Sequence, residues 1–232
     1  YLGGHFSLMI IDNDSNINIG TAAGTTLSAA SSSINGNKGN DTINIGGAGA
    51  ENFVNFTVFG GQGSDTINAI AVTTEDLTIS GDLGNDNITS GSGDDTVIGG
   101  DGNDTMDGSA GDDTITGDAG DDTLLGNAGD DTIVGGNGND VLTGGAGTNE
   151  LTGSLGADTF TVGAGADTWI LTSVEDSAAA VSGATVTFDN VTGPLAGDDI
   201  DITAIADTLA GGTLTGAVAA GVGIAVATAA TF

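Results

Sequence analysis

Residues Gly81–Ile170 read GDLGNDNIT SGSGDDTVI GGDGNDTMD GSAGDDTIT GDAGDDTLL GNAGDDTIV GGNGNDVLT GGAGTNELT GSLGADTFT VGAGADTWI, which is ten nine-residue units without an insertion. Position 4 of every unit is Gly, and position 6 is Asp in nine units and Asn149 in the eighth. Position 8 is apolar in all ten units: Ile88, Val97, Met106, Ile115, Leu124, Ile133, Leu142, Leu151, Phe160 and Trp169. Self-similarity at a fixed period predicts a solenoid in which each unit is one structural repeat.

The repeat continues upstream in a less regular form. Gly36–Asn44 (GNKGNDTIN) and Gly60–Asn68 (GGQGSDTIN) are complete units, while Gly46–Val54 is a weaker one with Glu51 at the Asp position, which we interpret as a solvated turn residue. Units that start at residues 36, 60, 81 and 99 are 24, 21 and 18 residues apart. We therefore expect successive turns of one solenoid, the first two widened by loops, with Asp76–Ser80 alternating like a strand.

The charge of the chain restricts its partners. The 232 residues include 32 acidic side chains against one Lys or Arg, so the net charge is −31, and a compact fold at this charge repels itself unless cations bind. Disorder is the alternative, but the chain is 38% hydrophobic and its apolar positions are periodic. The carboxylates exclude direct binding to nucleic acid, and they exclude binding to anionic membranes unless metal ions bridge the two. The absence of Cys excludes disulfides and thiolate metal sites.

One unit alone cannot explain a stable fold. The pattern predicts a Gly-rich turn and then a three-residue strand with one inward side chain, so two units make one coil between two short parallel sheets. Such a thin core is opposed by the conformational entropy of the Gly-rich turns, and Asp would stack on Asp at about strand spacing, near 4.8 Å. Bound calcium would offset both the entropic cost and the repulsion between Asp residues, because it takes six to eight oxygen ligands. Magnesium keeps its water, and zinc prefers nitrogen or sulfur.

The units resemble the RTX family, the hemolysin-type calcium-binding repeats with the signature GGxGxDxUx. This resemblance implies an all-β fold, a right-handed parallel β-roll with a β-rich C-terminal cap, that holds multiple calcium ions. Each ion is expected between turns two units apart, bound by carbonyls at positions 2 and 4 and the Asp of one turn, and by carbonyls at positions 1 and 3 and the Asp of the next. Carried over, one site consists of Gly100, Gly102, Asp104, Gly117, Ala119 and Asp122, and a site on the opposite edge of Ser109, Gly111, Asp113, Gly126, Ala128 and Asp131.

The parity of the units predicts two columns of position-6 residues, one on each edge of the roll. The first column contains Asp86, Asp104, Asp122, Asp140 and Asp158 and extends back through Asp65 and Asp41. The second column contains Asp95, Asp113, Asp131, Asn149 and Asp167. Because Asn149 lacks a charge, we expect the two sites that it shares to be weak or vacant. Position-5 acids such as Asp112, Asp121 and Asp130 are expected to face solvent and tune affinity, and Thr at position 7 is expected to face outward.

Four segments follow from these patterns. They are 1–35, irregular N-terminal strand and coil; 36–80, widened solenoid turns with loops; 81–170, the regular roll; and 171–232, a C-terminal cap, assembly segment and/or type I export segment. In the last of these, Gly197–Ile202 resembles the segment that caps RTX arrays. The uncharged Ala210–Phe232 is interpreted as packing strands, an export signal or both, rather than a transmembrane helix, since no Lys or Arg anchors it.

No sequence motif points to catalysis. GxSxG, HExxH, P-loop and paired Cys/His motifs are absent, so we expect no enzyme activity from this chain. The N-terminus lacks Met and a basic segment, which indicates a processed chain or a fragment. Two functions stay open: a secreted calcium-binding structural protein that self-assembles as an S-layer or extracellular filament subunit, and the C-terminal export and folding module of a larger secreted enzyme or toxin. The expected partners are calcium, further copies of the chain, and a calcium-bridged lipopolysaccharide or surface glycan.

Overall fold

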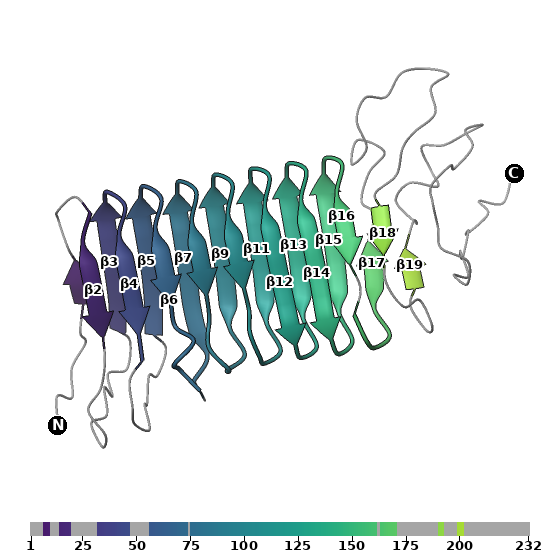
Figure 1. The fold of residues 1–232 in the computed structure, drawn as a ribbon, viewed down its shortest axis with the longest axis horizontal. Coiled ribbons are helices and arrows are strands. Elements are labelled where there is room, and N and C mark those ends of the chain that lie inside the picture. Colours follow the sequence, from purple (N-terminus) through teal and green to yellow (C-terminus); the bar gives the residue numbers. More distant parts are fainter. Residues whose placement is uncertain are drawn as a thin grey trace, which may run out of the picture.

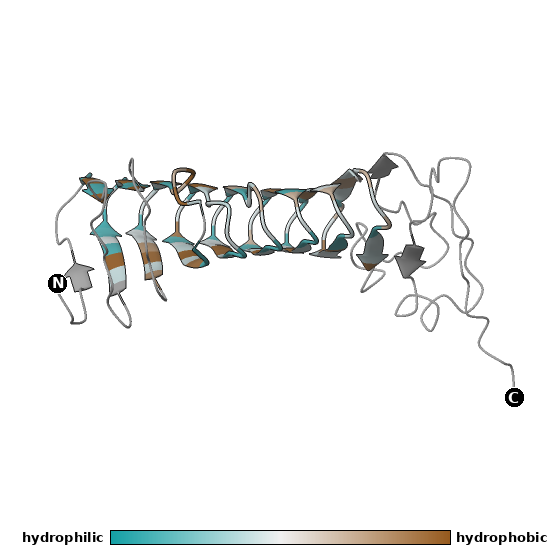
Figure 2. Ribbon diagram, turned by 90° about the horizontal axis from the view of Figure 1, so that it is seen from below, coloured by the Kyte–Doolittle hydropathy of each residue, from teal (hydrophilic) through white to brown (hydrophobic). Residues whose placement is uncertain are grey.

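The computed structural model describes residues 7–9, 14–19, 32–46, 56–73, 75–161, 163–170, 190–192 and 199–201. These residues form a β-solenoid in which two sheets face each other (Figures 1 and 2). The larger sheet has the order β1-β3-β5-β7-β9-β11-β13-β15-β17-β19, and the smaller has the order β18-β16-β14-β12-β10-β8-β6-β4-β2. Every strand pairing of the described part is parallel, which confirms the predicted all-β parallel solenoid.

The strands alternate between the two sheets along the chain. In order they are β1 Ser7–Met9, β2 Asn16–Ile19, β3 Ser32–Lys38, β4 Thr42–Ile45, β5 Phe56–Gln62, β6 Thr66–Asn68, β7 Leu77–Leu83, β8 Asn87–Thr89, β9 Thr96–Asp101, β10 Thr105–Asp107, β11 Thr114–Ala119, β12 Thr123–Ala128, β13 Thr132–Asn137, β14 Val141–Ala146, β15 Glu150–Leu155, β16 Thr159–Thr161, β17 Thr168–Ile170, β18 Asn190–Thr192 and β19 Asp199–Asp201. One strand of each sheet together with its two turns therefore makes one coil.

The register places the irregular upstream units in successive coils. Asn37 of β3 pairs with Gly61 of β5, Gly61 with Asp82 of β7, and Asp82 with Gly100 of β9. These pairs are 24, 21 and 18 residues apart, the same intervals that separate the unit starts. The extra residues therefore widen the coils without changing the stacking of the units. Glu51 lies outside the described residues.

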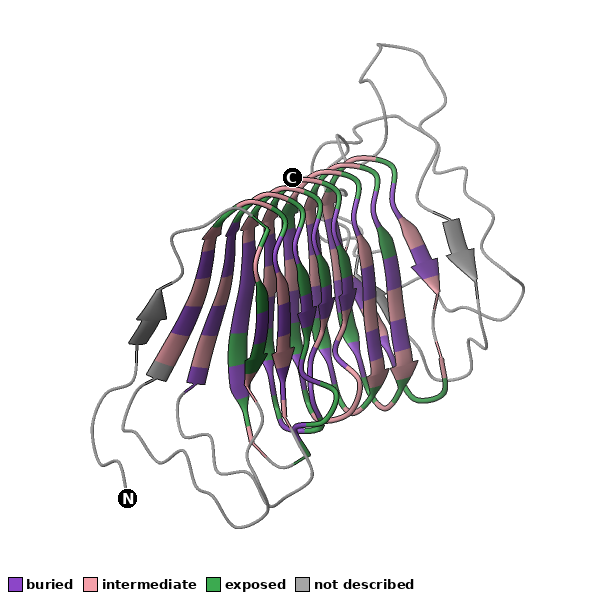
Figure 3. Cartoon of the chain, turned by 60° about the vertical axis from the view of Figure 1, so that its left-hand side comes forward, coloured by how far each residue is buried: buried purple, intermediate pink, exposed green. Residues whose placement is uncertain are grey.

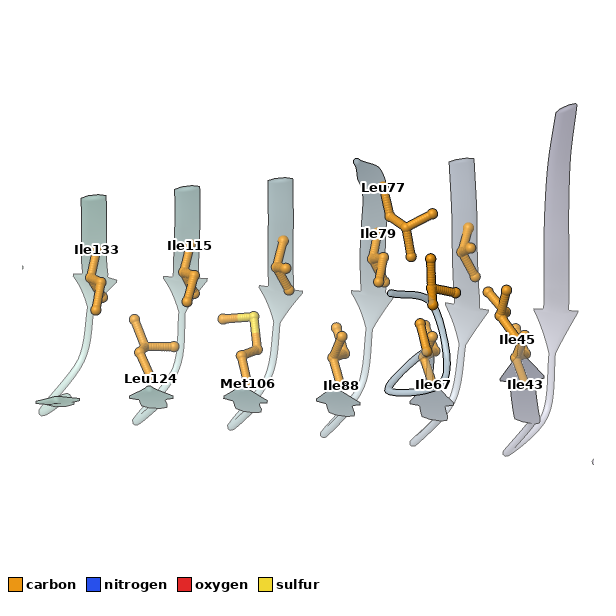
Figure 4. Close-up of a cluster of buried hydrophobic side chains, with 14 of the residues drawn as sticks. Ile43, Ile45, Ile67, Leu77, Ile79, Ile88, Met106, Ile115, Leu124 and Ile133 are labelled. Carbon is orange, nitrogen blue, oxygen red and sulfur yellow. The ribbon is translucent and has the colours of Figure 1, made fainter. Parts of the chain in front are cut away.

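The core consists of one row of apolar side chains from each sheet. All ten position-8 side chains are fully buried, and buried residues alternate with intermediate or exposed ones along the strands (Figure 3). Ile115 and Ile133 of the larger sheet point toward Leu124 and Met106 of the smaller sheet (Figure 4). Position-7 threonines such as Thr96 and Thr114 are exposed, as predicted. This core is a single layer of side chains, so its packing area per coil is small.

Part of the array has longer strands than the three residues that the repeat pattern predicts. β8, β10, β16 and β17 have the predicted three residues, whereas β9 and β11–β15 run for six residues, from position 7 through position 3 of the next unit. The prediction was wrong for these six strands because position 2 bends the chain without ending the pairing. Asp118 there has a φ of 73° and still pairs with Gly136 of the next coil. A left-handed residue in mid-strand explains the Gly, Asp, Asn and Ser found at position 2.

Position 4 requires Gly for a steric reason. Gly102 has a φ of 136°, and a Cβ added there would collide with the carbonyl oxygen of Gly84 in the preceding coil. The tight stacking of the turns therefore leaves no space for any side chain at this position. This close approach brings the position-6 residues of successive coils together.

The two sheets extend beyond the repeat array at both ends. β2 pairs with β4 and β1 pairs with β3, so the solenoid begins before residue 36, and the predicted strand Ile17-Asn18-Ile19 is part of β2. β18 and β19 continue the sheets by pairing with β16 and β17, and β19 falls within the predicted cap sequence. The rest of 171–232, including Ala210–Phe232, lies outside the described residues. Among the described residues, no helix has the length and apolarity to cross a membrane.

Candidate metal centre

The position-6 residues form a buried hydrogen-bonded ladder on each edge of the solenoid. In Figure 1 the first column follows the upper turns and the second column the lower turns. The backbone N–H of Asp104 donates to Oδ1 of Asp122 at 2.8 Å, and that of Asp122 donates to Oδ1 of Asp140 at 2.8 Å. In the second column the N–H of Asp113 donates to Oδ1 of Asp131 at 2.9 Å. One oxygen of each carboxylate thus fixes the side chain against the preceding coil.

The second carboxylate oxygen has no such role. In eight of these residues, Oδ2 is buried and has no hydrogen-bond partner among the described residues: Asp41, Asp65, Asp86, Asp104, Asp113, Asp122, Asp131 and Asp140. These side chains are at most 3% exposed. A buried carboxylate oxygen without a partner is strongly unfavourable, so rows of such oxygens indicate an additional cationic ligand.

The glycines at position 1 preserve the space in front of these oxygens. A Cβ added at Gly99 would lie within 3 Å of both Asp104 Oδ2 and the carbonyl oxygen of Gly117 in the next coil. Two of the predicted ligands of one ion, Asp104 and Gly117, therefore converge on the same point. A carboxylate and a backbone carbonyl that share a space free of side chains fit the oxygen preference of calcium.

Two of the other predicted carbonyl ligands, Ala119 and Ala128, already accept a backbone hydrogen bond. The carbonyl of Ala119 accepts the N–H of Gly102 at 2.7 Å, and that of Ala128 accepts the N–H of Gly111 at 2.9 Å. Each carbonyl retains a second lone pair, so these bonds leave an acceptor for a cation. Three further carbonyls belong to residues at position 2 (Gly100 and Ser109) or at position 1 (Gly126) of these units. Their role as calcium ligands stays a prediction.

No cluster of side chains in the described ranges could hold a metal alone. Groups of three or more His, Cys, Asp or Glu with suitable geometry do not occur there. The candidate sites instead combine the carboxylates of two successive coils with backbone carbonyls. This ligand type suits a hard cation that accepts mixed oxygen donors, and calcium is the best match.

Burial makes the ionised form of these carboxylates unfavourable without a metal. The pKa of Asp113 is raised from 3.8 to about 8, chiefly by desolvation and also by the charges of Asp95, Asp131 and Asp94, against a backbone hydrogen bond that lowers it. Desolvation likewise raises the pKa of Asp122 to about 7 and, with smaller contributions from neighbouring charges, the pKa of Asp131 to about 6. A bound cation would reverse this balance because it favours the charged carboxylate.

Two members of the second column differ from the others. Both oxygens of Asp95 accept backbone hydrogen bonds, Oδ1 from Leu77 at 2.7 Å and Oδ2 from Gly91 at 3.0 Å. Asn149 fits the ladder, since its Oδ1 accepts the N–H of Asp131 at 2.9 Å, but its Nδ2 donates to Oδ1 of Asp167 at 3.0 Å. A donor group therefore lies where the neighbouring residues offer an oxygen.

A second ladder at position 5 was missed by sequence reasoning. The side-chain oxygen at position 5 accepts the backbone N–H of position 5 in the following coil, as in Asp112 to Asp130 at 2.8 Å and Asn103 to Asp121 at 3.1 Å. These residues are exposed, as predicted, but they also bond the turns to one another. The signal was available, because every position-5 residue from Asn85 to Asn139 is Asp or Asn, the residues whose short side chains hydrogen-bond nearby backbone.

Replacing Asp112 tests the structural role of this outer ladder. Asp112→Ala removes the acceptor for the N–H of Asp130 and is expected to lower the free energy of unfolding by about 1 kcal/mol in saturating calcium. Asp112→Asn keeps an acceptor oxygen and should retain most of that stability. Thermal unfolding of the two variants measures the difference. Equal losses in both variants would show that the charge, and not the hydrogen bond, is what matters at this position.

Comparison with known families agrees with this geometry. The family model described as RTX calcium-binding nonapeptide repeat (4 copies) matches residues 28–50, 57–69, 78–106, 98–133, 107–142 and 134–168. These matches cover more than half of the chain and include every position-6 residue of both columns. A search of curated proteins found no match.

Proposed function

Because the chain belongs to the family of RTX calcium-binding nonapeptide repeat proteins, we propose that it is a secreted structural protein that folds on binding extracellular calcium and then assembles at the cell surface. The observation that supports this proposal most strongly is the row of buried, unpartnered carboxylate oxygens on the edges of the solenoid. We propose that the chain acts through calcium binding and not through catalysis.

Calcium supply would control folding. Where calcium is scarce, as in the cytosol, the stacked carboxylates oppose the coil and the chain stays unfolded and exportable. Outside the cell, calcium binds between Asp pairs such as Asp104 and Asp122, and the binding free energy becomes folding free energy because the unfolded chain has no formed site. Type I export fits such a chain, since export of this kind needs an unfolded substrate.

The regularity and the composition of the chain support its assembly into a polymer. The described residues form a regular rod of parallel strands, and the sequence has one Lys or Arg and 4% aromatic residues, which suits an exposed extracellular polymer that resists trypsin-like proteases. The outward carboxylates at position 5 could bind further calcium that bridges to anionic groups of a lipopolysaccharide or surface glycan. An S-layer or an extracellular filament is the assembly that these properties favour.

The alternative is that the chain is the C-terminal export and folding module of a larger secreted enzyme or toxin. The uncharged segment Ala210–Phe232 after the repeats favours it, because its composition resembles a type I export signal. Calcium titration of the purified chain, followed by light scattering and electron microscopy, separates the two functions. Calcium-dependent polymers support the structural protein, whereas a folded monomer at saturating calcium, or a catalytic domain encoded upstream, supports the module.

A pair of adjacent substitutions tests the calcium sites. Asp122→Asn and Asp121→Asn each remove one negative charge, but Asp122 is buried in the first column and Asp121 is exposed at position 5. We expect Asp122→Asn to raise the calcium concentration at half-saturation by about tenfold, equivalent to roughly 1.4 kcal/mol, because two sites lose a charged ligand. Asp121→Asn should change it little. Equal shifts in calcium titrations of the two variants would contradict the assigned register.

A further inference from the structure

The two edges of the solenoid differ in their unsatisfied carboxylate oxygens. In the first column, successive coils present a buried Oδ2 that accepts no hydrogen bond from the described residues, at Asp41, Asp65, Asp86, Asp104, Asp122 and Asp140. These six residues form five neighbouring pairs without interruption. In the second column, Asp113 and Asp131 are neighbours that share this feature, and they are bounded by Asp95 on one side and Asn149 on the other.

Ser90 closes the space next to Asp95. The other units on both edges from Gly36 to Gly153 have Gly at position 1, but Ser90 occupies this position in the unit that contains Asp95. The Ser90 hydroxyl donates to the carbonyl oxygen of Gly108 at 2.6 Å, and Oδ2 of Asp95 turns to accept the N–H of Gly91. A site between Asp95 and Asp113 would need the Asp95 carboxylate and the Gly108 carbonyl. Both oxygens of Asp95 already accept backbone hydrogen bonds, and the Ser90 hydroxyl lies against the Gly108 carbonyl oxygen, so the space that position-1 Gly leaves open in the other units is filled here.

Asn149 closes the column on the other side of the pair. Its amide offers one oxygen, which already accepts the N–H of Asp131 at 2.9 Å. In the Asp-containing units, Oδ2 of the position-6 Asp lies beside the position-1 Gly. In this unit, Nδ2 of Asn149 lies beside Gly144 instead. A positively polarised amide group at this place repels a cation, so the sites on both sides of Asn149 lose a ligand and a charge.

The remaining pair in the second column, Asp113 and Asp131, lies among further negatively charged side chains. The exposed carboxylates of Asp94, Asp112 and Asp130 stand beside Asp113 and Asp131, and each contributes to their electrostatic environment. Position 5 of the first column is instead mostly Asn, as in Asn85, Asn103 and Asn139. The full site of the second column is therefore isolated along its edge but rich in charge.

We propose that the two edges bind calcium unequally: the first column holds a continuous file of ions, and the second column holds one full site, between Asp113 and Asp131. This inference rests on the proposed calcium binding, and it adds that Ser90 and Asn149 close the second column on either side of that site. Their hydrogen bonds hold the turns together where an ion is lacking. The chain thus has a metal-saturated edge and an edge that is stabilised partly by its own side chains.

Counting ions tests the inference. Native mass spectrometry of the full chain at saturating calcium gives the number bound, and circular dichroism verifies that each variant is folded. Ser90→Gly and Asn149→Asp both restore the residue that other units carry, so we expect them to fold. Ser90→Gly is expected to add about one ion, and Asn149→Asp about two, because each opens the sites on which it borders.

Two matched variants control for composition and charge. Ser64→Gly removes a serine at an exposed position 5, and Asn139→Asp adds the same charge as Asn149→Asp at another exposed position outside the columns. Neither is expected to change the number of tightly bound ions. An unchanged ion count in both Ser90→Gly and Asn149→Asp would overturn the inference while leaving calcium binding intact. Failure of the unmodified chain to bind calcium would overturn the proposed function as well.

Discussion

Removing calcium at neutral pH is expected to unfold the solenoid completely. Eight buried carboxylate oxygens have no hydrogen-bond partner among the described residues, and each unsatisfied buried polar group costs about 1–3 kcal/mol, more when charged. The total is at least comparable with the roughly 5–15 kcal/mol by which a domain is usually stable. A core of one side chain per strand buries too little apolar surface to offset this cost. Circular dichroism in excess chelator should therefore lose the β-sheet signal, and added calcium should restore it.

Magnesium is the control for a general effect of divalent charge. It requires a small octahedral site and gives up its water reluctantly, so at equal concentration it should restore little of the β-sheet signal. Recovery with magnesium equal to that with calcium would indicate charge screening and not oxygen coordination. A β-sheet spectrum that is unaffected by chelator would remove the role of the columns altogether.

Acid is expected to replace calcium in part. Burial raises the pKa of Asp65 and Asp122 to about 7, of Asp104 to about 6 and of Asp113 to about 8, all above the ordinary value of 3.8. Because these folded-state pKa values exceed those of the unfolded chain, protonation favours the folded state. The resulting stability is fully present below about pH 4 and is lost as the pH rises through the range of about 6 to 8.

The measurement is a pH titration of the chelated chain by circular dichroism. β-Sheet signal should grow as the pH falls from about 8 to about 4, and the apparent calcium affinity should weaken over the same range because calcium must displace protons. The Asn149→Asp variant adds a carboxylate to the second column and should steepen the transition. A chelated chain that stays equally unfolded at every pH would contradict the raised pKa values.

The sequence was sufficient to predict the fold because its period is strict. Gly at position 4, Asp at position 6 and an apolar residue at position 8 determine the turn, the ladder and the core, and the unit spacings of 24, 21 and 18 residues reappear as the strand register. The extension of the first column back to Asp65 and Asp41 was likewise predicted, and the N–H of Asp41 donates to Oδ1 of Asp65 at 2.7 Å.

Features that depend on contacts between residues far apart in the sequence could not be predicted from the repeat. The six-residue strands follow from left-handed residues such as Asp118, whose bend keeps the pairing with the next coil. The effect of Ser90 on Asp95 also depends on a carbonyl 18 residues away, at Gly108. By sequence Asp95 is an ordinary member of the column, and only the three-dimensional arrangement shows that its two oxygens are already used.

The most direct test of the account is a crystal structure of the calcium-loaded chain with an anomalous difference map. The account predicts peaks between successive coils of the first column, in contact with Asp104 Oδ2 and the carbonyl oxygen of Gly117, with calcium–oxygen distances of about 2.3–2.6 Å. An intact coil without density at these positions, or density only at the exposed position-5 carboxylates, would contradict the claim that calcium holds the stacked aspartates together.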